Sequence, residues 1–163
     1  MEQSASPFEW RIFYQWQQSG RFCTAGDERG DWLEPQVKDL LSQLSGREVT
    51  YYHRLHDDIY LLCAFHRTGL NGRNHQLVGM GLLLPIITFT HHAGQIHNVV
   101  VDKKFRGRGI GKGIVSEMLK SAKERFHMKY VDLTSRPARV EANRLYQSIG
   151  FLDRGTNCYR YTL

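Results

Sequence analysis

The sequence lacks a long uninterrupted apolar run, and this absence argues against a membrane-spanning helix. Its longest candidate, residues 78–87, is interrupted by two glycines and by Pro85. The first residues, Met1-Glu2-Gln3, show no basic cap followed by an apolar stretch, which argues against a secretory signal. We therefore expect a cytoplasmic protein that does not partner a membrane.

Cysteine is also scarce. The three cysteines, Cys23, Cys63 and Cys158, are an odd number and show neither metal-ligand nor redox spacing, so we expect reduced thiols. The adjacent pair His91-His92 lacks the i, i+4 spacing of a helical zinc pair. The sequence therefore predicts no metal site.

What is present is an ordinary globular composition in 163 residues, with 41% apolar and 23% charged residues. This length can bury one hydrophobic core, and no repeat or linker divides it, so we expect a single domain over residues 1–163. The net charge of +6 favours anionic partners. Much of it is concentrated within ten residues, at Lys103, Lys104, Arg106, Arg108 and Lys112.

The beginning of the chain can be interpreted in two ways. Ser6-Pro7-Phe8-Glu9 matches a helix capping box, whereas alternation over residues 10–16 favours a strand, which we prefer. Residues 20–34 are expected to form a loop, and Ala93-Gly94 a turn. The other expected elements are a helix from Pro35 to Gly46, a hairpin of strands 59–65 and 76–89, a strand over 95–102, a helix over 110–126, a strand over 130–134, a helix over 140–148, and a last strand over 157–163 that closes the sheet. Hairpins followed by a β-α-β-α-β run indicate a mixed α/β, or α+β, fold.

The segment from Val99 to Gly113 passes from a strand through a glycine-rich turn into an amphipathic helix. Such a turn lets the backbone approach a ligand, and the first helical N–H groups point outward with the positive end of the helix dipole. A pyrophosphate fits this arrangement. Glycines at every second position exclude the dinucleotide fingerprint G-x-G-x-x-G, and the missing Ser or Thr after Lys112 excludes a P-loop. A solvated basic turn is the alternative.

Two motifs in this order resemble the GNAT superfamily of acyl-CoA N-acyltransferases, in its bacterial acetyltransferase branch. The first is Val99-Val100-Val101-Asp102 followed by Phe105-Arg106-Gly107-Arg108-Gly109-Ile110-Gly111. The second is Ser135-Arg136-Pro137-Ala138-Arg139, then Ala142-Asn143-Arg144-Leu145-Tyr146, then Ile149-Gly150-Phe151. The resemblance implies a mostly antiparallel sheet flanked by helices, and it implies that the sheet splays beside strand 95–102.

The resemblance also assigns roles to residues. The backbone of Val99, Val100 and Val101 would hold the pantetheine arm of acetyl-CoA, and the Val99 N–H would stabilise the oxyanion. Asn143 would bind the coenzyme, and Tyr146 would be the general acid that protonates the leaving thiolate. The residues expected to hold the pyrophosphate are Arg106, Gly107, Arg108, Gly109, Ile110, Gly111 and Lys112.

The general base departs from the family pattern, because the sequence Gln95-Ile96-His97-Asn98 has no carboxylate where many relatives have one. His97 can replace it, since imidazole accepts a proton near neutral pH. Strand alternation from His97 to Val99 and Val101 predicts that these residues share a face. The alternatives are a structural histidine, or an amine that arrives deprotonated.

The resulting hypothesis is an N-acetyltransferase that moves an acetyl group from acetyl-CoA to a small-molecule or peptide amine. The resemblance is compatible with a homodimer. A non-catalytic acetyl-CoA sensor is the alternative. A nucleic-acid binder that grips phosphates with 103–112 ranks last, because the sequence has no base-reading or stacking motif. We therefore expect no nucleic-acid partner.

Overall fold

The computed structural model describes residues 8–13, 33–49, 59–68 and 74–163. In chain order, its elements are β1 (Phe8–Phe13), α1 (Leu33–Ser45), β2 (Tyr60–Thr68), β3 (Asn74–Ile87), β4 (His92–Val101), a 3₁₀ turn (Lys103–Phe105), α2 (Ile110–Glu124), β5 (Val131–Leu133) and α3 (Val140–Ile149). The predicted mixed α/β class is confirmed. Among these residues, no helix has the length and apolar character needed to cross a membrane.

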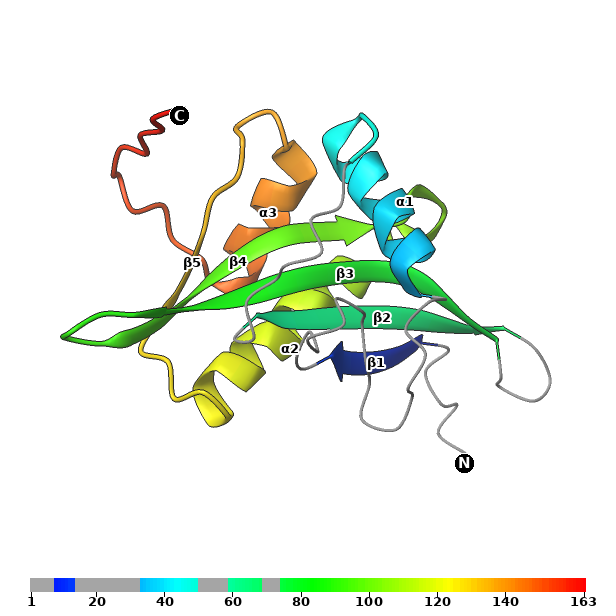
Figure 1. The fold of residues 1–163 in the computed structure, drawn as a ribbon, viewed down its shortest axis with the longest axis horizontal. Helices are drawn as coiled ribbons and strands as arrows, with labels where there is room; N and C mark the ends of the chain where they lie inside the picture. The colour runs from blue at the N-terminus through cyan, green and yellow to red at the C-terminus, as the bar shows by residue number, and fades with distance from the viewer. Residues whose placement is uncertain (1–7, 14–32, 50–58, 69–73) are drawn as a thin grey trace.

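The five strands form one sheet in the order β1-β2-β3-β4-β5. The pairs from β1 to β4 are antiparallel, and β5 joins β4 in parallel. Figure 1 shows α1 on one face of the sheet and α2 on the other, with α3 beside α2. The long β3–β4 hairpin extends beyond the helices.

Each face of the sheet buries its own apolar cluster. On the α1 face, Val37 and Leu40 of α1 pack with Cys63 and Phe65 of β2 and with Val100 of β4. On the α2 face, the cluster joins strand residues to α2 and α3; its members include Leu62, Ala64, Leu83, Ile96, Ile114, Met118 and Tyr146. This alternation of neighbouring strand residues is the period-2 pattern that a sheet covered on both faces requires.

Glycines on β3 let α2 approach the sheet closely. A Cβ added at Gly79 would lie 2.8 Å from Ile114 Cδ1, and one at Gly81 would lie 2.7 Å from Met118 Cε. These distances are shorter than real Cβ contacts allow. The position of α2, and of the turn that precedes it, therefore depends on β3 having no side chain at these two places.

Two sequence expectations are wrong. Ala93 and Gly94 lie inside β4, not in a turn, and the chain reverses at residues 88–91. Gly94 is needed for packing instead, because an added Cβ would lie 2.7 Å from Met128 Sδ and 2.9 Å from Leu83 Cδ1.

The tail 157–163 also forms no strand and does not close the sheet. It alternates in sequence, but Tyr159 and Tyr161 remain 86% and 87% exposed. Without buried side chains or a ladder, nothing offsets the entropy cost of ordering a strand. An ion pair between Arg154 and Asp132 of β5, at 2.9 Å, holds the chain just before the tail.

The remaining elements confirm the predictions to within a few residues. The preferred strand near the N-terminus is β1 for residues 8–13, while 14–16 lie outside the described residues. The first helix begins at Leu33, two residues before Pro35, so the end of the predicted loop 20–34 is helical. The rest of that loop also lies outside the described residues.

Candidate active site

The sheet opens between β4 and β5, as predicted for the coenzyme slot. The two strands pair only where 94–96 face 131–133. Beyond Ile96, residues 97–101 of β4 keep β3 on one side and pair with no described strand on the other side. We call this unpaired edge and the space beside it the β4 opening.

A bulge lies at the start of the opening. Asn98 and Val99 together face the single residue Gly81 of β3, because the register passes from Leu82–His97 to Met80–Val100. Asn98 has a φ of +52°, the left-handed conformation that asparagine tolerates better than most residues. Such a bulge inserts one residue and reverses the alternation of side chains after it.

The bulge therefore corrects the predicted position of His97. Its cross-strand partner is Leu82, which packs on the α1 cluster, whereas the neighbouring Ile96 belongs to the α2 cluster. Val99 and Val101 pack against the α2 cluster. His97 thus shares the α1 face with Val100, and the expectation that it shares a face with Val99 and Val101 is wrong.

The glycine turn, residues 106–112, joins the opening to α2. Gly107 and Gly109 have φ values of +75° and +76°, a conformation for which glycine is suited because it has no Cβ. Gly109 is the N-cap of α2, and the first bond of the helix is Gly113 N–H to Gly109 O at 2.9 Å. The backbone N–H groups from Gly109 to Lys112, at the start of α2, donate to no described residue. Such a row of free amides at a helix N-terminus can bind an anion.

The turn is held by contacts that the sequence did not indicate. Asp102 is buried and accepts from Lys104 N–H at 2.8 Å, which caps the 3₁₀ turn. Gln43 of α1 reaches the same place: its Oε1 accepts from Lys103 N–H at 3.1 Å, and its Nε2 donates to Asp102 at 3.4 Å. Arg106 Nε donates to Val101 O at 3.1 Å. The strand end, the turn and α1 therefore form one supported unit.

Two basic side chains of the turn remain available for a ligand. Arg108 is exposed, and its guanidinium lies over the Phe105 ring at 5.1 Å; Lys112 is exposed too. Within the described residues, neither forms a salt bridge. Their charges add to the attraction that the free amides have for an anion.

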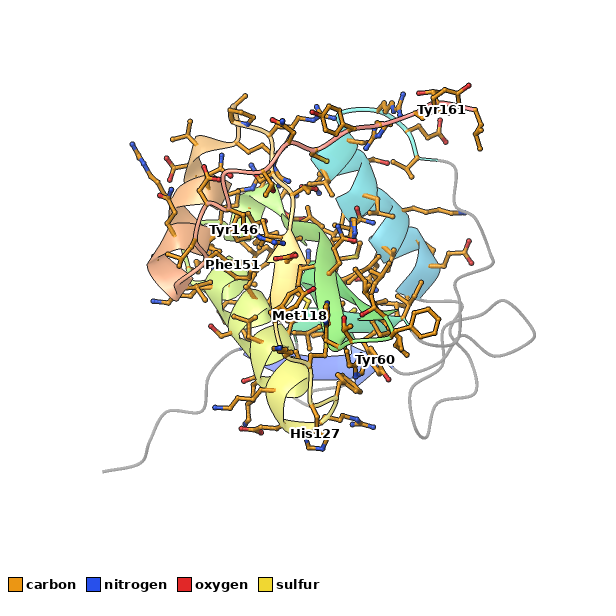
Figure 2. All side chains as sticks on the ribbon, turned by 90° about the vertical axis from the view of Figure 1, so that its left-hand side faces the viewer. Tyr60, Met118, His127, Tyr146, Phe151 and Tyr161 are labelled. Atoms are coloured by element: carbon orange, nitrogen blue, oxygen red, sulfur yellow. The ribbon has the colours of Figure 1, made fainter. Side chains whose placement is uncertain are left out.

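Helix α3 packs against the start of α2 and brings Tyr146 beside the α2 cluster. A Cβ at Gly111 would lie 3.1 Å from Leu145 Cδ1, so this glycine permits the close approach of the two helices. Tyr146 is 7% exposed, and its ring meets the edge of Phe151 at a centroid distance of 6.0 Å. Figure 2 shows these two residues together, where α3 lies beside α2, whereas Tyr161 lies far off near the end of the tail.

Burial raises the pKa of Tyr146 above its ordinary value, and the positive charge of Arg139 opposes this effect. The side chain is therefore a neutral proton donor at physiological pH. Its hydroxyl has no hydrogen-bond partner among the described residues.

Asn143 uses its amide within the protein. Its Nδ2 donates to the carbonyl oxygens of Arg136 at 3.0 Å and of Pro137 at 3.4 Å. These bonds hold the segment between β5 and α3. The role of Asn143 toward the coenzyme stays a prediction, and its side-chain oxygen is the atom left for it.

Comparison with known proteins agrees with this geometry. The acetyltransferase (GNAT) family model matches residues 10–151, so the chain belongs to the GNAT acetyltransferase family. This family uses acetyl-CoA as co-substrate. No curated protein sequence matches the chain.

Solved structures share the fold. An aminoglycoside acetyltransferase from an uncultured soil metagenomic sample, in complex with trehalose, has a TM-score of 0.72 and 14% identity, over 96% of this chain and 97% of that chain. A Trypanosoma brucei acetyltransferase has a TM-score of 0.67 and 21% identity, over 96% and 99%. Glucosamine-6-phosphate N-acetyltransferase from Arabidopsis thaliana has a TM-score of 0.55 and 18% identity, over 94% and 98%.

Proposed function

We propose that this protein transfers the acetyl group of acetyl-CoA to a primary amine by direct attack. One observation supports this most: the amides from Gly109 to Lys112 are free of described partners and follow the edge of β4 that no described strand pairs. The amides would bind the pyrophosphate, with Arg106, Arg108 and Lys112 adding charge. The backbone of Val99, Val100 and Val101 would hold the pantetheine arm along the β4 opening.

The chemistry is an acyl transfer without a covalent enzyme intermediate. The amine nitrogen attacks the thioester carbonyl carbon, and the Val99 N–H stabilises the oxyanion that forms. The C–S bond then breaks with its electron pair on sulfur, and Tyr146 donates its hydroxyl proton to that thiolate. The ammonium proton of the intermediate goes to His97 or to water, and a proton from solvent restores Tyr146. The products are an N-acetyl amine and coenzyme A.

For the acceptor, we propose small-molecule primary amines. Two of the similar folds are named as an aminoglycoside acetyltransferase and a glucosamine-6-phosphate N-acetyltransferase, which supports starting there. His97, on the α1 face, would meet the acceptor from the side of the sheet opposite Tyr146. A peptide amine is the other acceptor class to include.

The test is a coenzyme A release assay with acetyl-CoA and a panel of amino sugars, aminoglycosides, polyamines and peptides. Tyr146→Phe should lower kcat by about 100-fold, within the range typical of general acids, and keep the Kd for coenzyme A. Tyr159→Phe, which removes an exposed tail hydroxyl, is the matched control and should leave kcat unchanged. Tight binding with no release from any amine would instead favour the acetyl-CoA sensor.

A further inference from the structure

Arg139 lies at the β4 opening, and it belongs to the second sequence motif, but the resemblance assigned it no role. It is the N-cap residue of α3, and its side chain is half-buried. Its Nη2 donates to the carbonyl oxygen of Val99 at 3.4 Å. This bond crosses from α3 to the bulged, unpaired part of β4, so the guanidinium spans the space in which the pantetheine arm would lie.

The same guanidinium acts on Tyr146. Residues 139, 143 and 146 have the spacing i, i+4, i+7, which places them on one face of a helix. Arg139 is the charged group among the described residues whose field lowers the pKa of Tyr146. The positive charge of Arg139 therefore acts on the tyrosine hydroxyl, and its guanidinium also binds the Val99 carbonyl oxygen.

We propose that Arg139 is a catalytic residue whose guanidinium stabilises the departing coenzyme A thiolate between Val99 and Tyr146. This inference rests on the proposed acetyl transfer. When the C–S bond breaks, the electron pair goes to sulfur, and a fixed positive charge beside it lowers the energy of that anion. After Tyr146 has given its proton to the sulfur, the same charge stabilises the tyrosinate until a proton returns.

Arginine suits this role better than a neutral donor or a lysine. Its guanidinium stays protonated at every relevant pH and has several N–H donors in one plane. One N–H can keep its bond to Val99 O while others face the sulfur.

The experiment compares Arg139→Gln and Arg139→Lys with Arg144→Gln. Arg144 is the matched control, because it lies on the same helix, is exposed, and pairs only with Glu141 at 3.2 Å among the described residues. We expect Arg139→Gln to lower kcat about tenfold and Arg139→Lys less, while Arg144→Gln retains the wild-type kcat. In a Tyr146→Phe background, Arg139→Gln should cost much less than tenfold, because both residues act on the same anion.

The pKa of Tyr146 can be measured without turnover, so it tests the role of Arg139 separately from the proposed acetyl transfer. NMR of ¹³C-labelled tyrosine, with the Tyr146 signal assigned by its loss in Tyr146→Phe, should show a higher pKa for Tyr146 in Arg139→Gln than in wild type. A merely structural role would lower the unfolding temperature without moving this pKa.

The outcomes are distinct. If wild type acetylates an amine and Arg139→Gln keeps its kcat and the pKa of Tyr146, the role of Arg139 is overturned while the proposed function stands. If kcat falls but the loss is fully additive with Tyr146→Phe, the shared anion is overturned. If wild type releases no coenzyme A with any amine, both proposals fail.

Discussion

Replacing Gly109 by alanine tests the proposed diphosphate site most directly. Gly109 has a φ of +76°, and an added Cβ meets nothing within 4 Å, so the methyl group causes no clash. The substitution acts on the backbone alone. An alanine either keeps the left-handed conformation under strain or relaxes and rotates the peptide that carries the Ile110 N–H.

The free-energy cost of each outcome can be estimated. The left-handed conformation costs a non-glycine residue about 1–2 kcal/mol, which would appear as lost unfolding free energy. If the turn relaxes instead, at least one amide no longer points at the diphosphate. A hydrogen bond to a charged group contributes about 1.5–3 kcal/mol, so coenzyme A would bind about 10- to 100-fold more weakly.

The assay pairs urea unfolding with calorimetric titration of coenzyme A. Gly46→Ala is the control, since Gly46 ends α1 with a φ of +74° and also has nothing within 4 Å. If the strain is kept, both variants should lose similar stability and keep their affinity for coenzyme A. If the turn relaxes, Gly109→Ala should keep its stability and lose affinity. Wild-type stability together with wild-type affinity in Gly109→Ala would mean that the turn relaxed without loss of binding, and this result would refute the assignment of the diphosphate to the glycine turn.

Three further predictions follow from buried groups. Burial raises the pKa of Tyr146 above its ordinary value of 10.0, so the folded state holds the hydroxyl proton more tightly than the unfolded state does. The protonated hydroxyl therefore contributes fully to the unfolding free energy below pH 10. This contribution is lost as the pH rises through the raised pKa. Above pH 10, the unfolding free energy measured with urea should therefore fall more steeply with pH in wild type than in Tyr146→Phe. Parallel plots of unfolding free energy against pH would contradict this prediction. Burial also raises the pKa of the Cys63 thiol, whereas Cys158 is exposed; iodoacetamide with peptide mapping should label Cys158 first and Cys63 only in urea. The buried Ser135 hydroxyl has no hydrogen-bond partner among the described residues, so Ser135→Ala should leave the unfolding free energy unchanged or raise it by up to about 1 kcal/mol. A loss of unfolding free energy in this variant would contradict the prediction, because it would mean that the hydroxyl forms a stabilising hydrogen bond.

The helices could be predicted from sequence because each carries its own local signals. Pro35 near the start and Gly46 after the end bracket α1, and Gly150, with a φ of +112°, ends α3 where predicted. The apolar residues of α2 recur at helical spacing, and the structure buries them against the sheet. These signals act within a few residues, so they do not depend on the rest of the chain.

Gly94 shows where local signals fail. Glycine marks a turn when its backbone freedom is needed, but here it makes room for Met128 and Leu83, which are distant in sequence. The tail shows the opposite failure, because alternating residues cannot form a strand without a neighbouring edge. Both errors come from contacts that a sequence window does not contain.

The sequence by itself determined the glycine turn, because glycines between a strand and an amphipathic helix set the backbone of the turn from local geometry alone. It also determined that Tyr146 lies on a helix three residues after Asn143. Only the tertiary structure decided that the bulge at Asn98 turns His97 to the α1 face, and that Arg139 reaches the Val99 carbonyl. These positions depend on strand register and on the packing of α3, and both are set by partners far away along the chain.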